Sequence, residues 1–112
     1  MRTRIKFCGL VRVDDVRTAA ALGVDAVGFV FYPKSPRLLD AAQAAGLRRL
    51  LPSWVAAVGL FVNAPEGAIR RVAGAVGLDV IQFHGDEDPR TCEQERPAGL
   101  SYWRAIRMRE GD

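Results

Sequence analysis

Apolar residues gather in five short runs along the chain, and the segments between them carry apolar positions at helical spacing. The runs lie near residues 3–8, 26–31, 54–62, 79–83 and 101–107. They are continuous rather than alternating, which is typical of parallel strands that are covered on both faces by helices. We therefore predict five buried parallel strands.

The segments after the first two runs predict two helices, each with one apolar face. Asp40 stands where a cap of the second helix is expected, because its carboxylate can accept a hydrogen bond from the first helical turn. The predicted apolar faces are Val13, Val16 and Ala20 in the first helix, and Ala44, Leu47 and Leu51 in the second.

Two further helices are predicted in the second half of the chain. Pro65 is expected to open the third helix, since proline is favoured in a first helical turn. Asp88-Pro89 is expected to begin a short fourth helix that ends before Pro97. The apolar face of the third helix is Ile69, Val72, Ala73 and Val76.

The alternation of strands and helices demands parallel strands joined by right-handed crossovers. Two α/β architectures use this order, an open doubly wound sheet and a (β/α)8 barrel. A barrel needs about 200 residues or more, and this chain has 112. A five-stranded flavodoxin-like sheet fits the length but normally ends with a fifth helix, for which residues 107–112 leave no room. The pattern alone leaves both open.

Composition narrows the class of protein. Hydrophobic residues make up 49% and charged residues 26% of the chain, as in ordinary globular domains. The net charge is only +3, and the basic residues are scattered among acidic ones, so we expect no nucleic-acid partner. We expect no membrane span and no signal peptide, because no apolar run is long enough and the first residues are not apolar.

Cysteine and glycine usage adds further expectations. The two cysteines, Cys8 and Cys92, are far apart, and the chain has neither a C-x-x-C pair nor a histidine cluster. A disulfide framework and a metal site are therefore not expected, and the reducing cytoplasm is the expected compartment. Cys92 is interpreted as a packing residue of the fourth helix. No G-x-G-x-x-G or P-loop motif supports a nucleotide cofactor.

Three chemically capable side chains follow predicted strands. Cys8 ends the first run and Gly9 follows at once, Arg37 lies in a loop after the second run, and His84 follows the fourth. Parallel α/β proteins bind ligands beyond the carboxyl ends of their strands. We therefore predict a functional site at this edge, with Lys6 on the same strand face as Cys8.

Each residue suits a definite chemistry. A thiol ionises close enough to neutral pH to act as a base or nucleophile. A guanidinium suits bidentate recognition of a carboxylate or phosphate, and Pro33 and Pro36 stiffen the loop that carries Arg37. The alternative interpretations are a packed cysteine, a solvated arginine and a hydrogen-bonded histidine. The acidic residues 86–88 are interpreted as a solvated helix start.

Four segments together resemble phosphoribosylanthranilate isomerases, and the resemblance covers essentially the whole chain. They are Lys6-Phe7-Cys8-Gly9-Leu10, residues 28–37 (GFVFYPKSPR), residues 58–63 (VGLFVN) and residues 81–87 (IQFHGDE). The resemblance implies a (β/α)8 TIM barrel, of which residues 1–112 are the N-terminal half: about four βα units plus strand five of one truncated domain.

The resemblance also implies an activity, the Amadori rearrangement of N-(5-phosphoribosyl)anthranilate to 1-(2-carboxyphenylamino)-1-deoxyribulose 5-phosphate in tryptophan biosynthesis, without metal or cofactor. Cys8 is then the general base, Arg37 holds the anthranilate carboxylate, and Lys6 and His84 line the substrate pocket. Val11 stands where the family usually has threonine. The family's general-acid aspartate and phosphate-binding loops belong to later strands, which this chain does not contain.

Two other functions stay open at this point. In the first alternative, the chain is an inactive half-barrel, or a subunit that needs a C-terminal half in trans. Its unpaired edge strands then favour self-association. The last alternative is a flavodoxin-like binding module, for which no phosphate or flavin motif is present.

Overall fold

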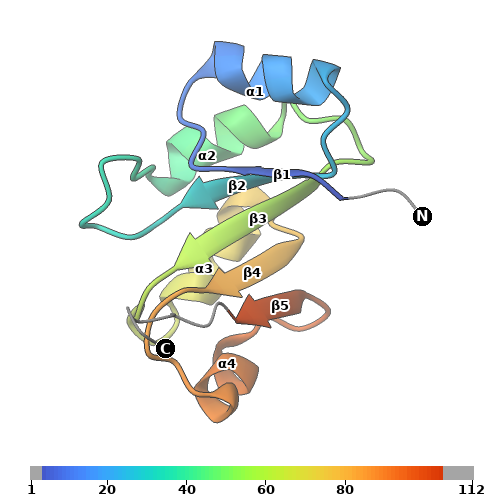
Figure 1. The fold of residues 1–112 in the computed structure, drawn as a ribbon. Helices are drawn as coiled ribbons and strands as arrows, with labels where there is room; N and C mark the ends of the chain where they lie inside the picture. Colours follow the sequence, from blue (N-terminus) through green and yellow to red (C-terminus); the bar gives the residue numbers. More distant parts are fainter. Residues whose placement is uncertain (1–3, 105–112) are drawn as a thin grey trace, which may run out of the picture.

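A computed structural model describes residues 4–104 as one parallel sheet with helices between its strands (Figure 1). The strands are β1 (Lys6–Cys8), β2 (Ala26–Val30), β3 (Ala56–Phe61), β4 (Val80–Phe83) and β5 (Ser101–Arg104). The helices are α1 (Val13–Ala21), α2 (Ala41–Arg48), α3 (Ala68–Val76) and α4 (Pro89–Glu95). All nine elements lie where the sequence predicts them, although the strands are shorter. The parts of the first and last predicted strands at residue 3 and residues 105–107 lie outside the described residues.

Strand order decides between the two predicted architectures. The strands lie side by side in chain order, β1-β2-β3-β4-β5, and every neighbouring pair is parallel. A flavodoxin-like sheet has the order 2-1-3-4-5, because its helices are divided between two faces. Sequential order is that of a (β/α)8 barrel. The described residues therefore form a barrel-type α/β sheet.

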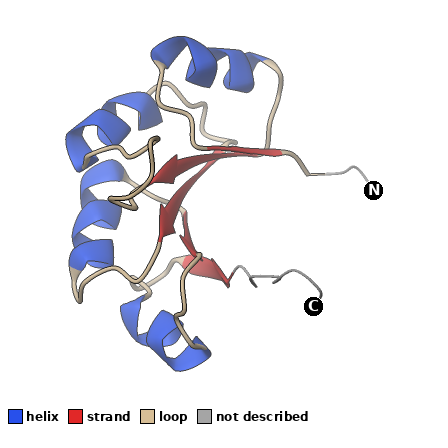
Figure 2. Ribbon diagram, turned by 60° about the vertical axis from the view of Figure 1, so that its left-hand side comes forward, coloured by secondary structure: helices blue, strands red, loops and turns tan. Residues whose placement is uncertain are grey.

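The sheet is rolled, and the four helices lie on its convex face (Figure 2). Adjacent strands are about 4.8 Å apart, so β1 and β4 of a flat sheet would be separated by about 14 Å. Lys6 Nζ of β1 nevertheless donates a hydrogen bond to Gln82 Oε1 of β4. The prediction that helices cover both faces is wrong. Continuous apolar strands arise here because the second face lines the concave interior of a rolled sheet.

Alternation along each strand sorts the side chains between the two faces. The convex-face residues join the helices in one hydrophobic core, which includes Val27, Phe29, Ala57, Phe61, Ile81 and Phe83. The remaining residues of the strands face the concave side, and the register pairs them between neighbouring strands. They are Lys6, Cys8, Ala26, Gly28, Val30, Ala56, Val58, Leu60, Val80, Gln82, Ser101 and Trp103.

Helices α1 and α2 test the first predicted apolar faces. In α1, Val16 and Ala19 are buried, whereas Val13 is 45% exposed, so the buried face is displaced from the predicted one. In α2 the prediction is confirmed, because Ala44 and Leu47 are buried. Asp40 caps α2 through a capping box, in which Asp40 Oδ1 accepts from Gln43 N at 2.7 Å and Gln43 Oε1 accepts from Asp40 N at 3.0 Å.

Helices α3 and α4 differ in how well their starts were predicted. Pro65 does not open α3. It begins a turn in which its carbonyl accepts from Ala68 N at 3.1 Å, and Gly67 precedes the helix with a left-handed φ of 81°. Helix α4 begins where it was predicted to begin, and Asp88 caps it by accepting from Thr91 N at 2.8 Å. The backbone hydrogen bond from Thr91 lowers the pKa of the Asp88 carboxyl.

Two aspartates join the amino ends of neighbouring strands. Asp25 Oδ2 accepts from Ile5 N at 2.7 Å, and Asp79 Oδ2 accepts from Ala57 N at 2.8 Å. In both cases the carboxylate stands just before a strand and binds the start of the strand that precedes it in the sheet. Both aspartates follow a glycine and an apolar residue, so the same three-residue pattern precedes β2 and β4. None of the helices within residues 4–104 has the length and apolar character to cross a membrane.

Packing at the centre of the sheet predicts the effect of adding one methyl group. A Cβ at Gly59 of β3 would stand 2.5 Å from Leu78 Cδ1 and 3.0 Å from Phe61 Cε2. Gly59→Ala is therefore expected to lower the free energy of unfolding by about 1–3 kcal/mol, as overpacked core substitutions do.

Gly46 supplies the matched control, because a Cβ there meets nothing within 4 Å and the residue lies inside α2. Gly46→Ala is expected to raise the free energy of unfolding by about 0.5–1 kcal/mol. Urea denaturation of both variants measures the difference. Equal stabilities would contradict the close contact at Gly59.

Candidate active site

The thiol of Cys8 lies on the concave face at the carboxyl end of β1. Cys8 is exposed, and its strand partner is Gly28 of β2. A Cβ at Gly28 would stand 2.9 Å from Cys8 Sγ and 3.2 Å from Lys6 Cε. Cys8 and Lys6 thus occupy the space that any larger residue at position 28 would fill. The prediction of an accessible sulfur at the strand end is confirmed.

The Lys6 ammonium group points across the concave face, away from the helices. Nζ donates to Gln82 Oε1 and lies 5.5 Å from the centroid of the Trp103 ring. A cation over an aromatic face is attracted to its electron density. Lys6 is therefore held by groups from β4 and β5, neither of which the sequence analysis had assigned a role.

Arg37 is brought against Gly9, the residue after Cys8, by a loop of tight turns. Within this loop, Ser35 N donates to Tyr32 O at 3.0 Å, and Ser35 Oγ accepts from Arg37 N at 3.1 Å. The Arg37 side chain lies across Gly9, where a Cβ would stand 2.6 Å from Arg37 Cδ. Gly9 has a φ of 83°, a backbone conformation in which glycine has no steric penalty.

His84 follows β4 at the same edge of the sheet. Its N–H donates to Phe61 O at 2.9 Å, which continues the ladder between β3 and β4. The alternation along β4 assigns His84 to the face that carries Gln82. The imidazole Nδ1 is buried and has no hydrogen-bond partner in the part of the chain that the structure describes.

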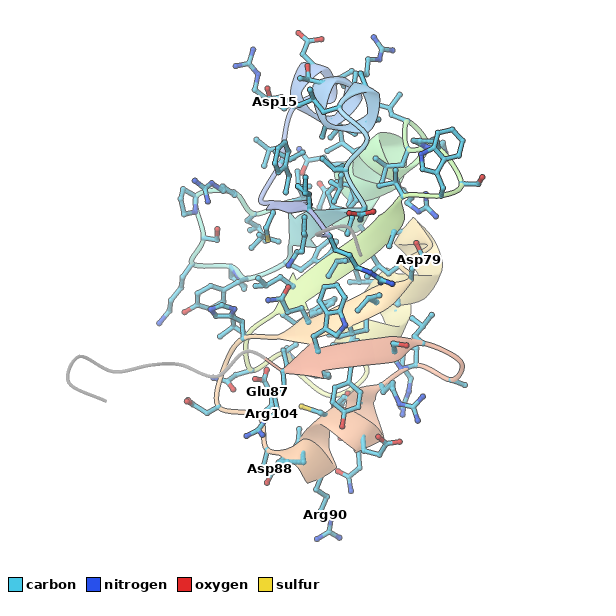
Figure 3. The ribbon with its side chains drawn as sticks, turned by 45° about the vertical axis from the view of Figure 1, so that its right-hand side comes forward. Asp15, Asp79, Glu87, Asp88, Arg90 and Arg104 are labelled. Carbon is cyan, nitrogen blue, oxygen red and sulfur yellow. The ribbon has the colours of Figure 1, made fainter. Side chains whose placement is uncertain are left out.

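The acidic run after His84 is not uniformly solvated. Asp86 and Asp88 are exposed, as predicted, but Glu87 is only 9% exposed. Glu87 Oε2 accepts from Asn63 N at 2.6 Å, and Oε1 accepts from Gly85 N at 2.8 Å. Glu87 is buried because two backbone donors from different loops replace water around its carboxylate. Figure 3 places it beside Arg104, where the β4–α4 loop meets β5.

The second cysteine is unsuited to proton transfer. Cys92 of α4 is fully buried, and burial raises the pKa of its thiol, as does the nearby charge of Glu87. Both cysteines are free thiols. The prediction that Cys92 is a packing residue is confirmed, and Cys8 is the accessible thiol of the chain.

Other candidate sites are weaker among residues 4–104. No group of three or more His, Cys, Asp or Glu side chains there is arranged to hold a metal ion. A cavity of about 520 Å³ lies between the β2–α2 and β3–α3 loops, but Cys8, Arg37 and His84 are all missing from its lining. The candidate site is therefore the carboxyl edge of the sheet, where Cys8 and Lys6 lie over Gly28 on the concave face and Arg37 lies across Gly9.

Comparisons with known proteins identify the family of this chain. The family model described as N-(5'phosphoribosyl)anthranilate (PRA) isomerase matches residues 5–111. The enzyme of that name from Nitrosococcus oceani is 49% identical over 99% of this chain and 52% of its own length. The one from Methylibium petroleiphilum is 52% identical over 99% of this chain and 51% of its own. The chain thus spans about half the length of the curated relatives it matches.

Solved structures show the same similarity. Phosphoribosyl anthranilate isomerase from Thermotoga maritima superposes with a TM-score of 0.88 at 36% identity, over 94% of this chain and 51% of that one. Another isomerase, solved in complex with reduced 1-(o-carboxyphenylamino)-1-deoxyribulose 5-phosphate, superposes with a TM-score of 0.80 at 40% identity, over 83% of this chain and 48% of that one. The chain therefore belongs to the N-(5'-phosphoribosyl)anthranilate isomerase family.

Proposed function

We propose that the protein carrying this chain isomerises N-(5-phosphoribosyl)anthranilate to 1-(2-carboxyphenylamino)-1-deoxyribulose 5-phosphate, and that residues 1–112 supply the N-terminal half of its barrel. The observation that carries the proposal is the exposed Cys8 thiol on the concave face, with the Arg37 side chain lying across the next residue, Gly9. A relative bound to the reduced form of this product supports the same substrate class.

Cys8 is proposed as the general base. The rearrangement begins when an acid protonates the ribose ring oxygen, which opens the ring to a Schiff base. The Cys8 thiolate then takes the proton from C2 of the sugar, and the electron pair of that C–H bond moves to give an enolamine. Tautomerisation of the enolamine yields the ketone, so the protein only moves protons.

Three further residues are proposed to hold the substrate. The Arg37 guanidinium offers paired donors to the anthranilate carboxylate. Lys6 adds a positive charge lower on the concave face, where it is held against Gln82 and Trp103. His84 lines the pocket from the end of β4. The general acid and the phosphate-binding loops are proposed to come from outside residues 1–112. We infer a cytoplasmic location, which suits two free thiols.

A second candidate function follows from the edges of the sheet. Among the described residues, β1 pairs only with β2, and β5 pairs only with β4. Ile5, Phe7 and Trp103, which lie at these edges, are each more than a third exposed. Unpaired edges with exposed apolar side chains favour association with further strands. In this alternative, residues 1–112 are an inactive half-barrel that self-associates or needs a C-terminal half in trans.

Removal of the base is the first test. Cys8→Ala is expected to reduce kcat by about two orders of magnitude or more, because general-base catalysis contributes at least that much. The measurement is steady-state turnover of the protein carrying this chain. Cys92→Ala is the matched control and is expected to keep kcat, since Cys92 is buried in α4. An unchanged rate for Cys8→Ala would remove Cys8 from the role of base.

Loss of the guanidinium is the second test. Arg37→Ala is expected to raise KM about tenfold or more with a smaller change in kcat, because a charge-assisted pair to the substrate carboxylate is lost. Arg17→Ala, an exposed arginine on the convex helix α1, is the control and is expected to leave KM unchanged. A KM that does not respond to Arg37→Ala would contradict carboxylate binding there.

Complementation tests the second candidate function. A polypeptide of residues 1–112 alone is expected to show no turnover, and to regain it when the C-terminal half of a relative is added. Turnover by residues 1–112 alone would contradict the proposal that the general acid lies outside them. If the added half binds without restoring turnover, the trans-complementing subunit is excluded.

A further inference from the structure

Glu87 is the one buried charged residue among those that the structure describes. The burial of its carboxylate therefore needs a physical explanation. Moving a carboxylate out of water costs several kcal/mol unless donors replace the lost water. Both oxygens are satisfied here, one by Asn63 N at 2.6 Å and one by Gly85 N at 2.8 Å. Asn63 follows β3 and Gly85 follows β4, so one carboxylate joins the two loops at the edge that carries the proposed site.

The side chain of Asn63 in turn binds the loop that carries Glu87. Its side-chain Oδ1 accepts from Asp86 N at 3.0 Å, so each partner holds the backbone of the other's loop. Asn63 has a φ of 46° and is the only non-glycine residue with a positive φ among residues 4–104. Such a conformation persists where surrounding contacts enforce it, and these outliers cluster at functional sites. We call Asn63 and Glu87 the loop clamp.

The side chains of the loop clamp leave no room for a side chain at position 85. A Cβ at Gly85 would stand 2.7 Å from Asn63 Oδ1 and 2.9 Å from Glu87 Oε1. From β5, Arg104 Nε donates to the Glu87 carbonyl at 2.9 Å, which ties the third strand end to the same point (Figure 3). The loops after β3 and β4 are thus locked together and to β5.

His84 lies at the centre of this lock. The backbone N–H groups of three successive residues are all bound: His84 to Phe61 O, Gly85 to Glu87 and Asp86 to Asn63. The imidazole Nδ1, in contrast, has no partner within the described residues. The direction of the ring is therefore set by its backbone and packing, and the loop clamp is what holds that backbone.

We propose that Asn63 and Glu87 are positioning residues, which hold the His84 imidazole in the substrate pocket by fixing the backbone that follows β4. This inference rests on the proposed function only for the role of His84 in binding substrate. The locking of the loop stands on the hydrogen bonds themselves. The two parts are therefore tested by different measurements.

The first measurement is nuclear magnetic resonance of the protein carrying this chain, in which the His84 ring signals are assigned by their loss in His84→Ala. In the unsubstituted protein, the Gly85 and Asp86 amides are expected to exchange with solvent at least about tenfold more slowly than those of free loops. The ring nitrogens are expected to show one dominant tautomer. Fast exchange of both amides would overturn the proposal without any variant.

Two variants then open the clamp in different ways. Glu87→Gln keeps the shape but loses one acceptor oxygen, and Asn63→Gly keeps the left-handed backbone but loses the side-chain oxygen. Each is expected to speed exchange of Gly85 and Asp86 about tenfold or more and to average the ring tautomers. Glu66→Gln, the same chemical change at an exposed residue of the β3–α3 loop, is the control and is expected to change neither. Unchanged His84 signals in Asn63→Gly would overturn the clamp, even if Glu87→Gln does not fold.

The second measurement is a double-substitution cycle on kcat/KM of the protein carrying this chain. Glu87→Gln is expected to lower kcat/KM about tenfold alone, but less than about twofold in the His84→Ala background, because it acts through that ring. Equal losses in both backgrounds would show a general structural role and overturn the positioning role. If no variant or parent isomerises the substrate, the proposed function fails while the exchange data still decide the clamp.

Discussion

The parallel ladder that runs in chain order from β1 to β5 is the constraint on which the rest of the molecule depends. Because every strand points the same way, the loops that follow them meet at one edge, and Cys8, Arg37 and His84 arrive there together. Register matters as much as direction. A shift of β1 by one residue would turn Cys8 from the concave face to the helices, since successive side chains alternate. The pairing of Cys8 with Gly28 sets this register at the proposed site.

Two glycines, which have no side chain, create the space in which the proposed chemistry takes place. Gly28 leaves room for Cys8 and Lys6 on the concave face, and Gly9 leaves room for Arg37 at the rim. Each reactive group therefore lies over a glycine of a neighbouring segment. This arrangement brings the Arg37 side chain against Gly9, the residue after Cys8, although 28 residues separate Arg37 from Gly9 in the chain. A glycine at such a place is part of the site even though it carries no functional group.

The acidic run after His84 shows why a local interpretation can fail. Burial of a carboxylate is costly, so a run of acidic residues at a helix start is ordinarily solvated, and Asp86 and Asp88 follow that rule. Glu87 does not, because a backbone N–H from Asn63, 24 residues earlier, takes the place of water. No pattern within a few residues of Glu87 contains that donor. The same holds for Gln82, whose partner Lys6 is 76 residues away.

The sequence by itself determined the five strands, the four helices and the cap at Asp40. These features depend on neighbours within a few residues, and periodicity and capping chemistry describe such neighbours well. Its motifs also indicated the family and the thiol at the end of β1. Only the tertiary structure decided the strand order, the roll of the sheet, the start of α3 after Gly67, and the burial of Glu87. Each of these depends on contacts between segments distant in the chain, which form only when the ladder brings the strand ends to one edge.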